Sequence, residues 1–350
     1  MTDFPTTPPR EDARLPVALV TGFLGSGKTT LLNRLLRDPR LADSAVLVNE
    51  FGAVGLDHLL IEPVDAETVL LPSGCVCCTV RAELRDALLD LWDRRQRGIL
   101  PPFRRIVMET TGLADPAPIA QTLAVDPRLR HHYALGRIAT VVDGLTGAAT
   151  LAAHDEAVAQ AAVADLLLLS KADLAAREDL TALERDLAAL NPAAPVLRLD
   201  PDDPAALDPV IRDLLGPPGG HAFPTRPAAT SHSRHGPVNA VCLTADEPLD
   251  WAAFALWFTL LLHRHGRDVL RSKGLLHLKG VPTPVVVHGV QHVVHRPGHL
   301  PAWPGNGRPR TTLVLIGRGL DEAALARSFR VFTQPARNAP AGSGAAALTA

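Results

Sequence analysis

An eight-residue segment near the start of the chain has the residue types of a phosphate-binding loop, GFLGSGKT at positions 22–29. Its glycines allow a tight curl in which backbone N–H groups point at phosphate oxygens. In such a loop the ammonium group of Lys28 reaches the β- and γ-phosphates, and the hydroxyl of Thr29 coordinates Mg²⁺. A compact apolar run at 15–21 precedes the segment and leucines at helical spacing follow it, as a strand and a helix would. The residues predicted to bind the nucleotide here are Gly22, Gly25, Ser26, Gly27, Lys28, Thr29 and Thr30.

A second motif, Ser170-Lys171-Ala172-Asp173, indicates which base the nucleotide carries. It follows the apolar run 166–169, at a strand end where a GTPase places an [N/T/S]-K-x-D sequence, with Ser170 replacing the usual asparagine. The Asp173 carboxylate can accept two hydrogen bonds from the N1–H and N2–H₂ edge of guanine, which adenine does not present, and the Lys171 stem can lie across the ring. Asp173 could instead cap the next helix, and the phosphate loop alone would equally fit an ATP-dependent kinase or ATPase. The two motifs together favour guanine.

Acidic residues follow two further apolar runs. Glu109 opens the sequence Glu109-Thr110-Thr111-Gly112 after the run 106–108; its carboxylate can hold a Mg²⁺-bound water, and Gly112 offers an amide close to the γ-phosphate. The alternative is a strand that ends in a polar turn. Asp143 also follows a strand, at the edge where open α/β sheets bind ligands, and either touches the site or caps a helix. Since no residue stands out as a water-orienting glutamine, we expect slow intrinsic hydrolysis through positioning and electrostatics.

Three of the four cysteines lie together, at Cys75, Cys77 and Cys78. Thiolates at this spacing can converge on one Zn²⁺ or Co²⁺ ion and leave a fourth position for Glu50, a histidine or a transfer partner. A structural zinc site would need a second cysteine pair, which the sequence lacks, because Cys242 lies in an apolar strand and is expected in the core. The cluster therefore indicates a transferable or regulatory metal, and the alternative is a redox-active or buried cluster.

Composition limits the class of protein. A chain of 350 residues exceeds the usual size of a single core, so two domains are expected. A net charge of −2 gives no reason to expect nucleic acid or an anionic membrane as a partner. The polar N-terminus lacks the apolar core of a signal peptide, and the longest apolar runs are too short to span a bilayer. We therefore expect a cytoplasmic protein, in keeping with clustered cysteines in a reducing compartment.

Apolar runs alternate with amphipathic stretches over the first two hundred residues. Continuous apolar runs are typical of strands buried on both faces, so the pattern predicts an α/β domain of the P-loop NTPase type, doubly wound around a mostly parallel sheet. The strands are expected at 15–21, 45–48, 69–71, 106–108, 138–142, 166–169 and 196–199, with helices at 28–37 and 81–95. This domain is predicted to occupy 15–216, after a flexible N-terminus at 1–14 and before a Gly-, Pro- and His-rich linker at 217–236.

A smaller α+β domain is predicted at 237–333, followed by a disordered tail at 334–350. Its strands are expected at 238–243, 275–279, 285–290 and 312–316, and its helices at 250–265 and 321–332. The chain has 14 histidines, several of them clustered here, including His288, His292 and His295. They leave open whether this domain holds an auxiliary metal site or only surface and interface histidines. Arg271 and Lys273 could approach either the nucleotide or a partner.

The motifs taken together resemble the CobW family of metallochaperone GTPases, relatives of the nickel-delivery GTPases that serve hydrogenase and urease. The resemblance extends over about residues 15–333 and includes the sequence Arg271 to Gly274 and the segment 311–318. The motifs that carry it are GFLGSGKTT (22–30), VNEFG (48–52), GCVCC (74–78), ETTG (109–112) and SKAD (170–173).

This resemblance implies GTP hydrolysis coupled to the handling of Zn²⁺ or Co²⁺. Members are associated with zinc homeostasis, cobalt insertion in cobalamin synthesis and activation of metalloenzymes such as nitrile hydratase. It also implies a client metalloenzyme or a cobalamin-synthesis complex as partner, and a homodimer that depends on nucleotide or metal. By the same analogy VNEFG is a switch that senses the γ-phosphate, and Glu50 within it takes part in catalysis and couples the nucleotide to the metal. A rival is a zinc storage or sensing protein in which the nucleotide only sets conformation.

Overall fold

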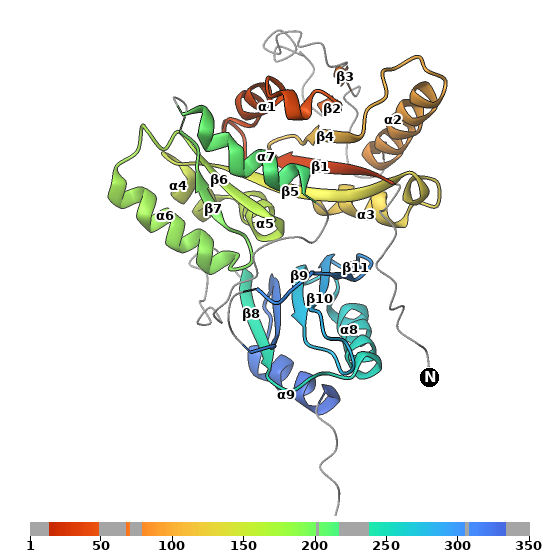
Figure 1. Cartoon of the computed structure of the whole chain (residues 1–350). Coiled ribbons are helices and arrows are strands. Elements are labelled where there is room, and N and C mark those ends of the chain that lie inside the picture. Colours follow the sequence, from red (N-terminus) through yellow and green to blue (C-terminus); the bar gives the residue numbers. More distant parts are fainter. Residues whose placement is uncertain are drawn as a thin grey trace, which may run out of the picture.

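The computed structural model describes residues 14–48, 68–70, 79–200, 203–216, 238–304 and 308–333. These residues form two packed parts, with the nucleotide-binding motifs in the first and a smaller sheet domain in the second (Figure 1). Glu50 and the three clustered cysteines lie outside the described residues, so the predictions about them stay predictions. The same holds for the proposed flexible N-terminus, linker and tail.

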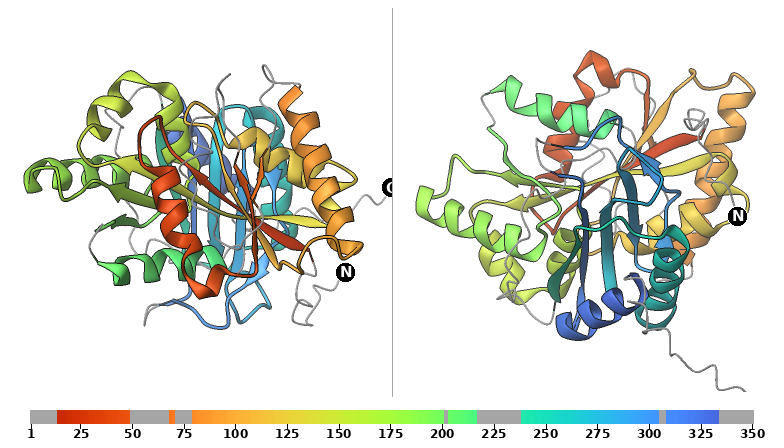
Figure 2. Two further views of the ribbon diagram at one scale, coloured as in Figure 1. Left: turned by 90° about the horizontal axis from the view of Figure 1, so that it is seen from above. Right: turned by 60° about the horizontal axis from the view of Figure 1, so that its bottom comes forward.

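The first part contains a sheet whose seven described strands are all parallel, in the order β3-β2-β4-β1-β5-β6-β7. Seen from above, its strands fan out between α6 on one side and α2 on the other (Figure 2). The predicted parallel α/β domain is thus confirmed. The strands are β1 (Leu15–Thr21), β2 (Ser44–Val48), β3 (Thr68–Leu70), β4 (Arg105–Glu109), β5 (Tyr133–Asp143), β6 (Leu166–Ser170) and β7 (Val196–Arg198).

Helices cover both faces of this sheet because successive strand residues point to opposite sides. Leu19 of β1 packs into one apolar cluster with α2, α3, α5 and α6, whereas its neighbour Val20 packs into another with α1 and α7. Short 3₁₀ turns lie at Pro39–Leu41, Leu129–His131 and Pro204–Leu207. The helices are α1 (Lys28–Leu36), α2 (Thr79–Gln96), α3 (Ala117–Val125), α4 (Gly147–Ala153), α5 (Asp155–Val163), α6 (Arg177–Leu190) and α7 (Asp208–Leu215).

The second part is an antiparallel sheet in the order β11-β10-β9-β13-β8, with β12 paired to β10. One face of it packs against α8 and α9 through the rings of Phe254, Trp257 and Phe329. The Asp250 carboxylate caps α8 by accepting from the amide of Ala253 at 3.0 Å. The elements are β8 (Val238–Ala245), α8 (Trp251–His265), β9 (Val269–Leu276), β10 (Val285–Val290), β11 (Val293–Val294), β12 (Gly298–His299), β13 (Thr311–Arg318) and α9 (Glu322–Thr333).

The other face of the second sheet packs on the first part of the chain. Ala240, Val290 and Ile316 belong to the same apolar cluster as the α5 residues Ala157 and Ala161, so one core runs through both parts. Figure 1 shows α9 at the end of the second part farthest from the first. The two parts therefore meet through a continuous buried apolar interface.

The position of β9 corrects one prediction. A strand was expected at 275–279, but β9 runs from Val269 to Leu276. All eight of its residues are buried, including Arg271 and Lys273. Two charged residues this close together are more typical of a loop than of a buried strand. They lie in a strand here because the first part of the chain packs against them.

Cys242 in β8 is a free, half-buried cysteine that packs on the interdomain core, and burial raises the pKa of its thiol. This agrees with its expected packing role. Across the described residues, no helix combines the length and the apolar character that crossing a membrane requires.

Candidate nucleotide-binding site

The loop between β1 and α1 has a backbone that only glycine adopts easily. Gly22, Gly25 and Gly27 have φ values of 144°, 72° and 91°. A Cβ atom at Gly22 would lie 2.2 Å from the carbonyl oxygen of Val141 in the adjacent strand. The three glycines therefore let the loop curl over the end of the sheet and run directly into α1, as the phosphate-loop motif predicts.

Two polar side chains of this loop are held in defined positions. Lys28 is buried, and its ammonium group donates to the carbonyl of Phe23 across the loop at 3.1 Å. Thr29 donates from its hydroxyl to a carboxylate oxygen of Glu109 at 2.7 Å. Because β1 and β4 are parallel neighbours, with Val20 opposite Glu109, the end of β4 brings this carboxylate to the start of α1. The structure thus joins two predicted site residues from different motifs.

The sequence after Glu109 lies against the phosphate loop. Thr110 donates from its hydroxyl to that of Thr21 at 2.7 Å and from its amide to the carbonyl of Val20 at 3.0 Å. A Cβ atom at Gly112 would lie 2.6 Å from the amide nitrogen of Leu24. Only glycine fits such a close approach of two backbones, which accounts for Gly112 in the motif.

The predicted base-reading motif is bonded to the same loop. The Ser170 hydroxyl donates to the carbonyl of Ser26 at 2.6 Å, so the serine that replaces asparagine still ties the two segments together. Lys171, which has a φ of 52°, donates to the carbonyl of Gly25 at 2.9 Å. Asp173 is exposed, and α6 begins after Ala176 with no side-chain cap, so the alternative that Asp173 caps this helix is wrong.

Asp143 contacts the predicted base-reading motif and the turn before α4, but it does not cap that helix, which has no side-chain cap. One carboxylate oxygen accepts from the amides of Leu145 and Thr146 at 2.8 and 3.0 Å, in the turn before α4. The other pairs with the ammonium group of Lys171 at 2.6 Å. Burial alone would raise the pKa of Asp143, but the hydrogen bond from Lys171 and the two amides outweigh it and hold the pKa below its usual value. The ionised Asp143 therefore fixes the lysine of the base-reading motif.

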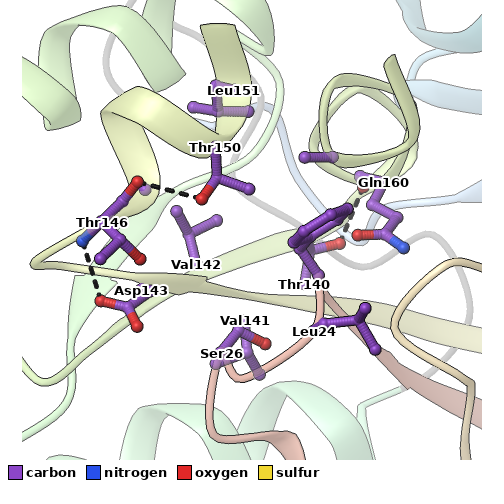
Figure 3. Close-up of a pocket in the computed structure, with 13 residues that line it drawn as sticks. Leu24, Ser26, Thr140, Val141, Val142, Asp143, Thr146, Thr150, Leu151 and Gln160 are labelled. Carbon is purple, nitrogen blue, oxygen red and sulfur yellow. Dashed lines mark hydrogen bonds between the residues drawn. The ribbon is translucent and has the colours of Figure 1, made fainter. Parts of the chain in front are cut away.

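A pocket lies directly beside the phosphate loop, between the end of β5 and the helices α4 and α5 (Figure 3). Leu24 and Ser26 of the loop, Thr140 of β5 and Gln160 of α5 are among the residues that line it. Thr140 donates from its hydroxyl to the backbone carbonyl of Gln160 at 2.8 Å. Sequence reasoning missed Gln160, although it is the single polar side chain in an otherwise apolar stretch, AVAQAAVA.

The second part of the chain holds a buried polar cluster far from the phosphate loop in sequence. Arg271 donates to the carboxylate of Asp165, and Lys273 donates to the carbonyl of Ala193 at 3.0 Å. Both basic residues thus bind the first part of the chain at the interface. The possibilities that they reach the nucleotide or a partner are not supported.

His288 and His295 stack beside this cluster with ring centroids 4.6 Å apart. Burial, followed by the charge of neighbouring groups such as Arg271, keeps the pKa of His288 well below its ordinary value and lowers the pKa of His295 to about 4. A positive neighbourhood opposes cation binding. Among the described residues no group of three or more His, Cys, Asp or Glu side chains is placed to hold a metal, so the auxiliary metal site finds no support there.

The parallel sheet with its glycine loop, basic residue and facing acid defines a P-loop nucleotide-binding protein. Comparison with family models identifies residues 16–198 as a CobW/HypB/UreG nucleotide-binding domain and residues 238–333 as a cobalamin synthesis protein cobW C-terminal domain. The chain belongs to the CobW family of P-loop metallochaperone GTPases, and the resemblance inferred from the motifs is confirmed.

Known relatives span nearly the whole chain. The zinc chaperone YjiA of Escherichia coli is 33% identical over 90% of this chain and 98% of its own. The zinc chaperone CobW of Pseudomonas aeruginosa is 33% identical over 91% of each chain. The crystal structure of Zn(II)-bound YjiA GTPase from E. coli matches with a TM-score of 0.67 at 26% identity, over 91% of this chain and 99% of that one. The similarity thus includes both domains.

Proposed function

We propose that this protein hydrolyses GTP and uses the nucleotide cycle to bind and release Zn²⁺ as cargo for a client protein. The observation that carries the nucleotide half of this proposal is that the phosphate loop, Glu109 and the Ser170–Lys171 segment are hydrogen-bonded into one site. Relatives similar over nearly the full chain are named zinc chaperones, which supports the metal half.

GTP fits this site as a substrate. The loop amides and Lys28 would hold the β- and γ-phosphates, Gly112 would lie near the γ-phosphate, and Asp173 would accept from the guanine edge. The buried hydroxyls of Ser26 and Thr111 have no hydrogen-bond partner among the described residues, as expected of groups that face a ligand. Buried polar atoms of this kind are costly unless something binds them.

Mg²⁺ fits the oxygens of Thr29 and Glu109, which lie 2.7 Å apart at the start of α1. A hard cation prefers such ligands, and phosphate oxygens and water would complete its shell. Bound Mg²⁺ would neutralise the charge that develops on the transferring phosphoryl group. The roles of the chain's own residues are to hold the ion's ligands and to orient the phosphates; Lys28 contributes a fixed positive charge.

The cargo site we propose is formed by Cys75, Cys77 and Cys78, with Glu50 as the candidate fourth ligand. Its support is the residue spacing and the names of the relatives. Three thiolates suit Zn²⁺, and Co²⁺ can adopt the same geometry. A zinc storage or sensing protein would have the same cysteines but would not need GTP turnover, so hydrolysis separates the two.

Two measurements test the proposal. Competition of labelled GTP by unlabelled GTP and ATP should show preference for guanine; equal competition by ATP would contradict the assignment of Asp173. Steady-state phosphate release should respond to added Zn²⁺ in the intact protein and lose that response in Cys77→Ser. Turnover that ignores zinc in both proteins would favour storage or sensing over delivery.

A further inference from the structure

Helix α5 lies between the nucleotide-binding sheet and the second domain. Every residue from 157 to 163 is buried, and the helix packs against β9 and β13 as well as β5. At its start, the ring of His154 stacks on Phe23 of the phosphate loop with centroids 4.4 Å apart. One helix therefore touches the nucleotide loop and the second domain at once.

Gln160 connects this helix to the loop that carries Gly112. Its side chain is 1% exposed, and its amide group donates to the carbonyls of Gly112 and Ala114 at 3.1 and 3.0 Å. Both donor hydrogens are thus used on one loop. That loop passes so close to the phosphate loop that a Cβ atom at Gly112 would lie 2.6 Å from the Leu24 nitrogen. The amide of Gln160 therefore helps to set the distance between the two loops.

The end of α5 is tied to the second domain. Asp165 follows the helix; one carboxylate oxygen accepts from the amide of Ile138 at 3.2 Å and the other from the guanidinium of Arg271 in β9. Asn191 donates to the carbonyls of the last turn, which closes this end of the helix. A shift of β9 would move the C-terminal end of α5, because this ion pair is almost fully buried and protein interiors are close-packed.

We infer that Gln160 is a positioning residue for the nucleotide site and that α5 makes this position depend on how Arg271 seats the second domain. The inference rests on the proposed use of GTP at this site. A displacement of β9 in the second domain would move the Gly112 loop and so change the affinity for a nucleotide with a γ-phosphate. By reciprocity, a γ-phosphate would alter how the second domain sits.

The physical reason is that α5 has little freedom to absorb a displacement. Its buried positions are mainly alanine and valine, which pack without the rotamer changes that long side chains allow. The helix can therefore shift only as a unit, and Gln160 transmits the shift to two carbonyls of one loop. Such coupling is measured as a coupling free energy between two positions.

A double-mutant cycle in the full-length protein tests this inference. Gln160→Ala and Arg271→Met are made singly and together, and the dissociation constants of GDP and a non-hydrolysable GTP analogue are measured. We expect each single change to weaken the analogue on the order of fivefold more than GDP. The double variant should match Gln160→Ala alone, because Arg271 acts through that amide. Independent effects that multiply would overturn the inference.

Two controls keep the outcome clear. Gln121→Ala removes the same kind of amide at the same interface, where it donates to the side chain of Gln291 in the second domain, and should leave both affinities within about twofold. If Arg271→Met does not fold, Asp165→Asn keeps the shape of the side chain and weakens the same ion pair.

Hydrogen exchange of the segment 110–116 without nucleotide supplies an independent readout. Arg271→Met should speed exchange there in the wild-type background and not in the Gln160→Ala background. Unchanged exchange in Arg271→Met would refute the coupling. If the wild type bound no guanine nucleotide, the proposed function would fail, and this exchange experiment would still decide the inference.

Discussion

Lys273 leads to a prediction about stability, because burying its charged ammonium group destabilises the folded state by more than its contacts stabilise it. Burial lowers its pKa from 10.5 to about 8, Asp165 opposes this shift, and the positive charges of Arg271 and Arg137 add to it. The folded state therefore binds the lysine proton less tightly than the unfolded chain does. This destabilisation of the folded state is fully present below pH 8 and disappears as the pH rises from 8 to 10.5.

The size of the effect follows from the shift. A difference of about 2.5 pKa units corresponds to about 3 kcal/mol at neutral pH. Lys273→Met removes this penalty and also loses the hydrogen bond to the Ala193 carbonyl, a loss of about 2 kcal/mol. The variant should therefore be more stable than the wild type by about 1 kcal/mol at pH 7. Raising the pH to 9.5 should stabilise the wild type by about 2 kcal/mol and leave the variant nearly unchanged.

Urea unfolding at pH 7 and pH 9.5 measures both effects. The exposed Lys279 provides the matched control, and Lys279→Met should follow the pH dependence of the wild type. The reasoning is refuted if the free energies of unfolding of the wild type and Lys273→Met change in parallel between the two pH values.

Three further predictions concern the nucleotide site and the interface. Asp173→Asn should transfer preference from guanine to xanthine nucleotides, because xanthine presents an acceptor where guanine has its N2–H₂ donor; competition binding measures this, and retained GTP preference would count against Asp173. Gly112→Ala should weaken a GTP analogue at least tenfold, since its Cβ would lie 2.6 Å from the Leu24 nitrogen; calorimetry showing normal affinity would contradict that close approach. The lowered pKa values of His288 and His295 mean that stability is full above pH 6.5 and falls as the pH drops below it; for His295, whose pKa in the folded state is about 4, the loss at pH 5 is about 2 kcal/mol. His295→Phe should lose part of this acid sensitivity in urea unfolding, and an unchanged pH dependence would argue against it.

Much of the nucleotide-binding half could be predicted because its signals are local. The glycines of the phosphate loop, the apolar runs of the buried strands and the acid at the end of β4 can each be recognised from a few neighbouring residues. Ser170, which stands where the motif usually has asparagine, donates to the carbonyl of Ser26 in the phosphate loop at 2.6 Å.

The interface could not be predicted in the same way, since its signals depend on distant partners. Arg271 and Lys273 look like solvated residues until Asp165 and the carbonyl of Ala193 are placed against them. Gln160 is similar: nothing near it in the sequence shows that its amide meets Gly112, 48 residues away. The roles of such buried polar groups are set by their tertiary contacts, and the hydrophobic periodicity of the sequence gives no information on these contacts.

We propose that the bound nucleotide controls how tightly the cysteine motif binds a metal ion. The most direct test is the Zn²⁺ dissociation constant of the reduced full-length protein, measured by chelator competition in the GDP-bound state and with a non-hydrolysable GTP analogue. We expect at least a fivefold difference between the two states, and loss of this site in Cys77→Ser. Equal zinc affinity in both nucleotide states would contradict the proposal.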